Sequence, residues 1–384
     1  MYAEQSIQDL IFLMLYGGIA MLAIAAGVYL WMRQSNAIAP AVTPPKSLRR
    51  WTAAFFFMAA ISHVWWYVIG IYWLSDDRLV RNIICVMLDH ITLVPLVIAL
   101  LLRLLQDQQR RIWPWVMTQT LIIGAAVVGI STRSDYGLDL MNNIQLGVIA
   151  VFSIYYIYAL VQYNRWLNEN YADLENKQVW HSLLLLVALL LIYETYFTNP
   201  GDMPKEYMSQ VFTLVIIAFL LWRVETLSEL TINCENASKV SMSEENGMEQ
   251  SYTRDLVIPS NIGSMLEQHC EATQLYLQHD LTLQQLAIAI GSNRTYLSKY
   301  FAQQDITYNS YINRLRILHF MQLYRDSCAS SRSVTATELA QQSGFHSYST
   351  FAAAFKHFNG QTVTTWMKAY PQEPTDSGAN TKLN

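Results

Sequence analysis

The stretch LTLQQLAIAIGSNRTYLSKYF, from Leu281 to Phe301, decides the fold of the C-terminal part of this chain. Thr282 and Gln285 have the spacing of a capping box, in which two side chains satisfy backbone amides at the start of a helix. Apolar residues then recur at helical spacing as far as Gly291, and Asn293 is placed to cap a second helix. A short helix, a glycine-containing turn and a second helix with a polar outer face is the layout of a helix-turn-helix unit. The stretch therefore predicts such a unit.

The same pattern returns in TATELAQQSGFHSYSTFAAAFKHFNGQT, from Thr335 to Thr362. Thr335 and Glu338 form a second predicted capping box, and Gly344 marks the turn. The buried side of the second helix is predicted to consist of Phe345, Phe351 and Phe355. Between the two units, YINRLRILHFMQLY (Tyr311 to Tyr324) predicts an amphipathic helix that sets their spacing. Two recognition helices on one rigid body can enter successive major-groove turns of double-stranded DNA.

At these residues the chain resembles the AraC-type bacterial transcription regulators. The resemblance rests on the motifs LTLQQLA, NRTYLSKYF and YINRLRI, and on a spaced motif that stands here as Gly344, Phe345, Phe351, Phe355, Lys356, Gly360 and Thr362. It covers residues 263–371, with a helix from Gly263 to Gln278 as the expected opening element. The resemblance implies a cytoplasmic DNA-binding domain of two helix-turn-helix units joined by a linker helix.

The outward positions of the two predicted recognition helices are candidates for contact with base edges or phosphates. In the first helix they are Arg294, Thr295, Ser298 and Lys299. In the second they are His346, Ser347, Tyr348, Ser349 and Lys356. Arg314 and Arg316 on the connecting helix could contact phosphates or pair with acidic neighbours. For every one of these residues, ordinary solvated surface is the alternative interpretation.

The composition indicates that the rest of the chain lies in a membrane. Hydrophobic residues make up 53% of the chain and charged residues only 14%, and the apolar residues gather in long stretches. Crossing a bilayer takes about 20 residues of apolar helix. The predicted spans are Leu10–Met32, Trp51–Leu74, Asn82–Leu102, Trp113–Ile130, Leu140–Val161, Trp180–Phe197 and Tyr207–Trp222.

Lysine and arginine in the connecting loops predict the orientation of these spans, because cytoplasmic loops carry an excess of both. With the N-terminus outside, the inner loops hold Arg33, Lys46, Arg49, Arg50, Arg103, Arg110, Arg111, Arg165 and Lys177, against Arg78, Arg81, Arg133 and Lys205 outside. We therefore expect a multi-pass protein of the bacterial inner membrane. An odd number of spans then places the C-terminal domain in the cytoplasm, where the DNA is.

Four polar residues within the predicted spans, His63, Asp89, His90 and Glu194, need an explanation because ionisable groups are costly in lipid. Hydrogen bonds between helices are one explanation. A site that senses an unidentified signal molecule or ion is a second explanation, and a proton relay is a third. No helical spacing joins the four residues, so a metal site is not expected. The four cysteines, Cys85, Cys234, Cys270 and Cys328, contain no Cys-x-x-Cys motif, which argues against zinc knuckles and structural disulfides.

The predicted organisation is all-α. Residues 1–232 form a seven-span transmembrane helix bundle, 233–262 a flexible linker, 263–371 the double helix-turn-helix domain, and 372–384 a disordered tail. The leading hypothesis is a membrane-integrated one-component transcription regulator, which could pair with a second copy through the end of its last span. The alternative is a transporter or channel with a regulatory helix-turn-helix domain. The chain has none of the common nucleotide, zinc-protease or serine-hydrolase motifs, so we expect neither enzymatic activity nor a cofactor.

Overall fold

The computed structural model describes residues 7–40, 42–70, 77–197, 203–230, 261–330 and 334–369, and for 192–197 it describes the backbone alone. Over these residues the protein is all-α, which confirms the predicted fold class. The chain divides into two compact units. The first comprises Met1–Asn164 and Asn176–Ser238, and the second Arg165–Glu175 and Lys239–Asn384.

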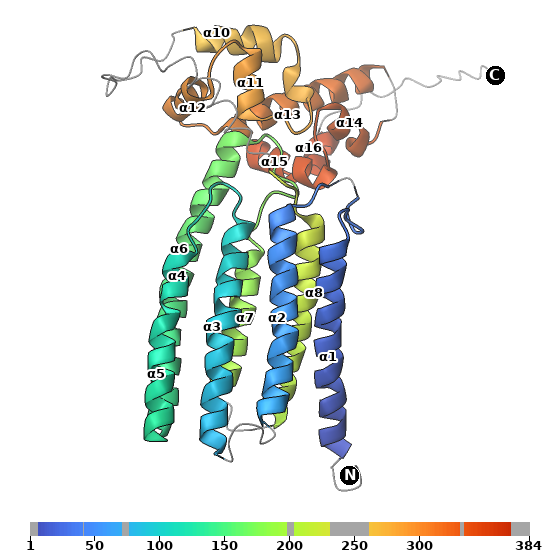
Figure 1. Cartoon of the computed structure of the whole chain (residues 1–384). Coiled ribbons are helices and arrows are strands. Elements are labelled where there is room, and N and C mark those ends of the chain that lie inside the picture. The colour runs from blue at the N-terminus through green and yellow to red at the C-terminus, as the bar shows by residue number, and fades with distance from the viewer. Residues whose placement is uncertain are drawn as a thin grey trace, which may run out of the picture. The chain divides into compact units, whose positions relative to one another are not determined.

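The first unit is built from apolar helices, most of them long, that run side by side (Figure 1). They are α1 (Ile7–Met32), α2 (Lys46–Gly70), α3 (Arg78–Leu104), α4 (Trp113–Met117), α5 (Gln119–Thr132), α6 (Asp135–Asn170), α7 (Ser182–Phe197) and α8 (Met203–Thr226). Helix α2 packs against α1, α3 and α8, and α8 also packs against α7. Each predicted span falls largely on these helices.

Within the described residues, six helical segments are long and apolar enough to cross a membrane, with α4 and α5 together counting as one. Helix α7 has 16 residues and falls short of the roughly 20 that a bilayer takes. Seven spans therefore remain a prediction. The largest difference from the expected boundaries concerns α6, which continues past Val161 as far as Asn170.

Helices α5 and α6 approach each other closely where two glycines meet. A Cβ on Gly129 would lie 2.9 Å from the Cα of Gly137, and a Cβ on Gly137 would run into the backbone of Gly129. Small residues allow helix backbones to come this close, which is a common way of packing helices in membranes. The pairing fixes the start of α6 against the end of α5.

The second unit contains shorter helices around two apolar cores. After α10 (Ile262–Leu266), a π-helical turn (Glu267–Glu271) and a 3₁₀ turn (Leu275–Leu277) come α11 (Leu283–Ala289), α12 (Arg294–Gln303), α13 (Tyr308–Ala329), α14 (Ala336–Gln342), α15 (Tyr348–Asn359) and α16 (Val363–Ala369). The expected single helix from Gly263 to Gln278 is thus replaced by an α-to-π stretch, a turn and a 3₁₀ turn. The connecting helix α13 extends beyond the predicted Tyr311–Tyr324 at both ends.

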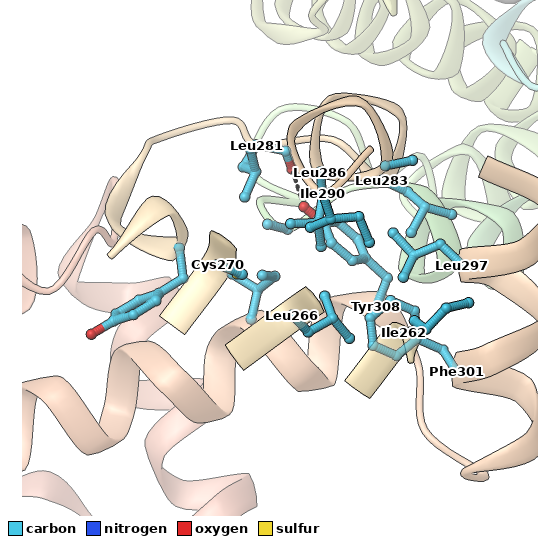
Figure 2. Packing of buried hydrophobic residues seen from close by; sticks show 14 residues of the cluster. Ile262, Leu266, Cys270, Leu281, Leu283, Leu286, Ile290, Leu297, Phe301 and Tyr308 are labelled. Atoms are coloured by element: carbon cyan, nitrogen blue, oxygen red, sulfur yellow. Dashed lines mark hydrogen bonds between the residues drawn. The ribbon is translucent and has the colours of Figure 1, made fainter. Parts of the chain in front are cut away.

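Figure 2 shows the first core, in which side chains of α10, α11, α12 and α13 point toward one another. The buried Tyr308 closes this core by donating its hydroxyl to the Leu281 carbonyl at 3.0 Å. The second core packs Phe320 of α13 against Phe345, Phe351 and Phe355, as the sequence pattern predicts. Helix α13 contributes to both cores and therefore joins the two halves of the unit.

The segment Arg165–Glu175, which we call the α6–α7 segment, belongs to the second unit although it lies far from the other residues of that unit in sequence. Ala172 in this segment is only 1% exposed and is part of the first core. The predicted linker at 233–262 lies almost wholly outside the described residues, and the predicted tail at 372–384 lies wholly outside them.

Candidate nucleic-acid interface

The first recognition helix, α12, is fixed by a cap and two buried side chains. Asn293 accepts a hydrogen bond from the backbone N–H of Tyr296 at 2.9 Å. Leu297 and Phe301 are buried in the first core. Both capping boxes predicted for the preceding helices, Thr282 with Gln285 and Thr335 with Glu338, are confirmed. Local sequence thus determines where each helix of the two units begins.

The four predicted contact residues of α12 lie on its outer side. Thr295 and Lys299 are exposed, whereas Arg294 and Ser298 are half-buried. The two pairs have i,i+4 spacing, which places their members one above the other on the helix. This side of the helix presents an ammonium group, two hydroxyls and a guanidinium. Groups of these kinds contact base edges and phosphates in the major groove.

The second recognition helix, α15, begins at a cap formed by Ser347, whose hydroxyl accepts from the backbone N–H of Thr350 at 3.3 Å. Ser347 is therefore the N-cap of α15. The other predicted contact residues are exposed, namely His346, Tyr348, Ser349 and Lys356. Next to them, Ala353 is exposed and offers no polar group. The outer face of α15 is therefore less polar than that of α12.

Gly344 makes the turn before α15 possible. Its φ is +86°, and a Cβ at this position would lie 2.8 Å from both the Cα and the carbonyl oxygen of Leu277. Glycine alone adopts this backbone without strain and leaves room for the neighbouring chain. The turn of the second half thus packs directly on the end of the opening element.

Arg316 is a buried joint between the two halves. It is 1% exposed, and its guanidinium donates to the carbonyl oxygens of Tyr276 and Gln278, each at 2.8 Å. Its Cζ lies 5.6 Å from the centre of the Phe345 ring. Burial lowers the pKa of Arg316. Neighbouring charges oppose this shift, and among them the charge of Asp173 has the largest effect. A guanidinium held in this way cannot reach a phosphate, so the predicted phosphate contact is corrected for Arg316. Arg314 is exposed, and its contact with a phosphate stays a prediction.

The polar residues predicted for the membrane bundle form hydrogen bonds within it. Asp89 accepts from the Ser62 hydroxyl and the Trp66 indole, each at 2.6 Å. The His63 ring contacts Ala59 O and Gln210 Oε1, and the His90 ring contacts Val86 O. Thus Asp89 is hydrogen-bonded to Ser62, the residue next to His63. The side chain of Glu194 lies outside the described part, and the described residues hold no cluster of metal ligands.

Sequence reasoning missed the α6–α7 segment as part of this unit. Asn170 Oδ1 accepts from Arg294 Nε and Nη2 at 3.0 and 2.6 Å, and Glu175 Oε2 accepts from the Thr350 hydroxyl at 3.4 Å. The available signal was the absence of glycine and proline between Val161 and Asn176, which allows α6 to continue.

Comparison with known proteins supports the assignment of the second unit. Residues 286–369 match the family model of a helix-turn-helix domain, and the match supports the AraC type. The chain is 34% identical over 100 residues to a Staphylococcus aureus (strain MRSA252) protein and 33% identical over 100 residues to one from strain COL. Both are named as uncharacterized HTH-type transcriptional regulators. Each match covers 25% of this chain and only 12% of the relative. No solved structure matches the chain. The likeness defines a helix-turn-helix domain at the C-terminus.

Proposed function

We propose that the protein is a membrane-integrated one-component transcription regulator. The observation that carries the proposal is a pair of capped helix-turn-helix units, joined by α13, in one chain with six apolar segments of membrane-spanning length. The family match and the names of the relatives support DNA binding by the second unit. The apolar helices of the first unit support insertion into a bilayer, in contact with lipid.

In this proposal α12 reads the DNA sequence. Arg294, Thr295, Ser298 and Lys299 contact base edges and flanking phosphates from the major groove, since residues near the start of a recognition helix reach the bases. Helix α15, with Tyr348 and Ser349 at its start and Lys356 further along, mainly positions the unit on the backbone. Arg314 adds a phosphate contact.

The first unit serves as the sensor in this proposal. Its N-terminus is outside and the second unit is cytoplasmic, because the predicted inner loops carry more lysine and arginine than the outer ones. The hydrogen-bonded group around Asp89 and His63 is the place where an unidentified signal molecule would act on the helices. Pairing of two copies through the end of the last span is a further part of the proposal.

Chromatin immunoprecipitation of the full chain, tagged and expressed in a bacterial host that lacks its own copy, tests the proposal. The wild-type protein should enrich a defined set of promoter fragments, whereas Lys299→Ala should lower the enrichment of those fragments roughly fivefold or more. Lys368→Ala is the matched control, because Lys368 is also exposed but lies on α16, outside both recognition helices. Enrichment by the wild type no greater than by an untagged strain would refute DNA binding.

A further inference from the structure

The α6–α7 segment docks on the helix-turn-helix unit through its backbone. Tyr171 forms an antiparallel bridge with Thr282, and the N–H of Ala172 donates to the Leu281 carbonyl at 3.1 Å. Asn309 at the start of α13 donates to the carbonyl oxygens of Tyr171 and Ala172, at 3.2 and 2.7 Å. Contacts of this kind hold a segment in one register, independently of its side chains.

The side chains of the segment reach the beginnings of both recognition helices. Asn170 binds the guanidinium of Arg294, the first residue of α12, through two donors. Five residues later, Glu175 contacts Thr350, in the first turn of α15. One short stretch therefore contacts the first turn of the second helix in both halves of the domain.

The polar and acidic side chains of the α6–α7 segment can take the place of nucleic acid at the starts of α12 and α15. Asn170 presents a carbonyl oxygen to a guanidinium in the way that a base acceptor does. Glu169, Asp173 and Glu175 make the segment acidic, with Arg165 as its one basic residue. The charge of Asp173 also favours the protonated form of the buried Arg316. An acidic stretch held against recognition helices resembles the phosphate backbone in charge.

We infer that the α6–α7 segment is an intramolecular competitor of DNA for the recognition helices. This inference rests on the proposed function, because it requires that α12 and α15 bind DNA. A DNA duplex that binds α12 must break the hydrogen bonds between Arg294 and Asn170. A duplex that contacts the start of α15 must break the hydrogen bond between Thr350 and Glu175. The segment contains the C-terminal end of α6, whose earlier part belongs to the first unit, and the chain then leads on to α7. Changes at the ends of those helices would therefore weaken or strengthen the competition.

The first experiment releases the contact. The full chain in lipid nanodiscs is titrated with the promoter fragments that the wild type enriches in cells. Asn170→Ala should increase the affinity about tenfold, since hydrogen bonds to a charged group are worth that much or more. Gln162→Ala is the matched control, because it also removes an amide from α6, but Gln162 lies outside the segment and donates to the Tyr158 hydroxyl one turn earlier. Equal affinities for Asn170→Ala and wild type would overturn the inference.

The second experiment locks the contact. Residues paired across an antiparallel bridge are close enough for a disulfide. Tyr171→Cys with Thr282→Cys, in a chain with Cys234→Ser and Cys328→Ser, should form a cross-link on oxidation, lose DNA affinity at least tenfold and regain it with dithiothreitol. The single Thr282→Cys variant is the control, because it loses the same cap without a cross-link. A cross-linked protein that binds DNA as the reduced form does would refute competition, and so would failure of the folded protein to cross-link.

These results separate the inference from the proposed function. If the wild-type chain enriches no DNA in cells, the proposed function fails whether or not the cross-link forms. If the wild type binds promoters and neither release nor locking alters the affinity, the regulator stands and the competition is refuted.

Discussion

At the scale of single residues, two of the arginines of α13, Arg314 and Arg316, lie in different surroundings. Arg316 is buried between two backbone carbonyls and a phenylalanine ring, whereas Arg314 is exposed two residues earlier. A lysine cannot reproduce the planar, two-donor geometry of a guanidinium. Both positions carry arginine, so the difference between the buried Arg316 and the exposed Arg314 comes from their surroundings alone.

We predict that Arg316→Lys lowers the free energy of unfolding of the second unit by about 2–4 kcal/mol, because it breaks hydrogen bonds to a buried charge. Arg314→Lys should change it by less than about 0.5 kcal/mol. Thermal unfolding, with hydrogen exchange followed in peptides of residues 276–278 and 345–355, provides the measurement. Equal stabilities of the two variants would mean that Arg316 does not join the halves.

A second residue-scale prediction compares two glycines that share a left-handed backbone. Gly344 has φ +86° and no room for a Cβ, whereas Gly360 has φ +71° and nothing within 4 Å of the same position. Gly360→Ala should therefore cost only the backbone strain, about 1 kcal/mol. Gly344→Ala should cost several kcal/mol, since Leu277 must also move. Hydrogen exchange of residues 334–369 in the full chain would show the difference, and an equal effect of the two substitutions would contradict the close packing of the turn.

At the scale of elements, the contact between α5 and α6 depends on the absence of side chains at Gly129 and Gly137. Gly137→Ala should destabilise the first unit by about 1–3 kcal/mol, because the added methyl group overpacks the helix contact. Gly147→Ala, ten residues further along α6 with open space around it, should be neutral or slightly stabilising. Thermal unfolding in detergent micelles distinguishes the two. Gly137→Ala with wild-type stability would argue against this packing.

The elements also show which part of the structure could be predicted from the sequence. The caps at Thr282 and Thr335 depend on residues three positions apart, so the pattern is local and the sequence predicts it. The docking of Ala172 on Leu281 joins residues more than a hundred positions apart through backbone atoms, which carry no sequence signature. The phosphate contact predicted for Arg316 is wrong for a similar reason. The hydrogen-bond partners of Arg316 are the backbone carbonyls of Tyr276 and Gln278, and every residue has such a carbonyl. Only long-range packing determines such contacts.

At the scale of the whole molecule, the chain connects its two units in two ways. One connection is the stretch from α8 to α10, for which the sequence predicts a flexible linker. The other is the α6–α7 segment, which belongs to the second unit while it continues helices of the first. A flexible linker transmits no rotation. The segment contacts α12 and α15, so under the proposed competition it is the connection through which a change in the helix bundle would alter DNA binding.

The side of the membrane on which the second unit lies depends on whether α7 crosses the bilayer. Its 16 residues span about 24 Å, less than the roughly 30 Å of the hydrocarbon core. A helix of this length can still cross if the bilayer thins locally. With seven crossings and the N-terminus outside, the helix-turn-helix unit is cytoplasmic. With six, it is on the outer side, where no promoter is available.

Alkaline phosphatase fusions decide between these cases, because the enzyme needs disulfides that form only outside the cytoplasm. We predict activity for fusions after Ser134 and Asp202, and none after Gln108 and Asn233. The first and third of these junctions test the orientation of the earlier helices and serve as internal controls. If α7 did not cross, the results at Asp202 and Asn233 would be exchanged while those at Ser134 and Gln108 stayed the same. That exchange would contradict a cytoplasmic DNA-binding unit, and with it the proposed function.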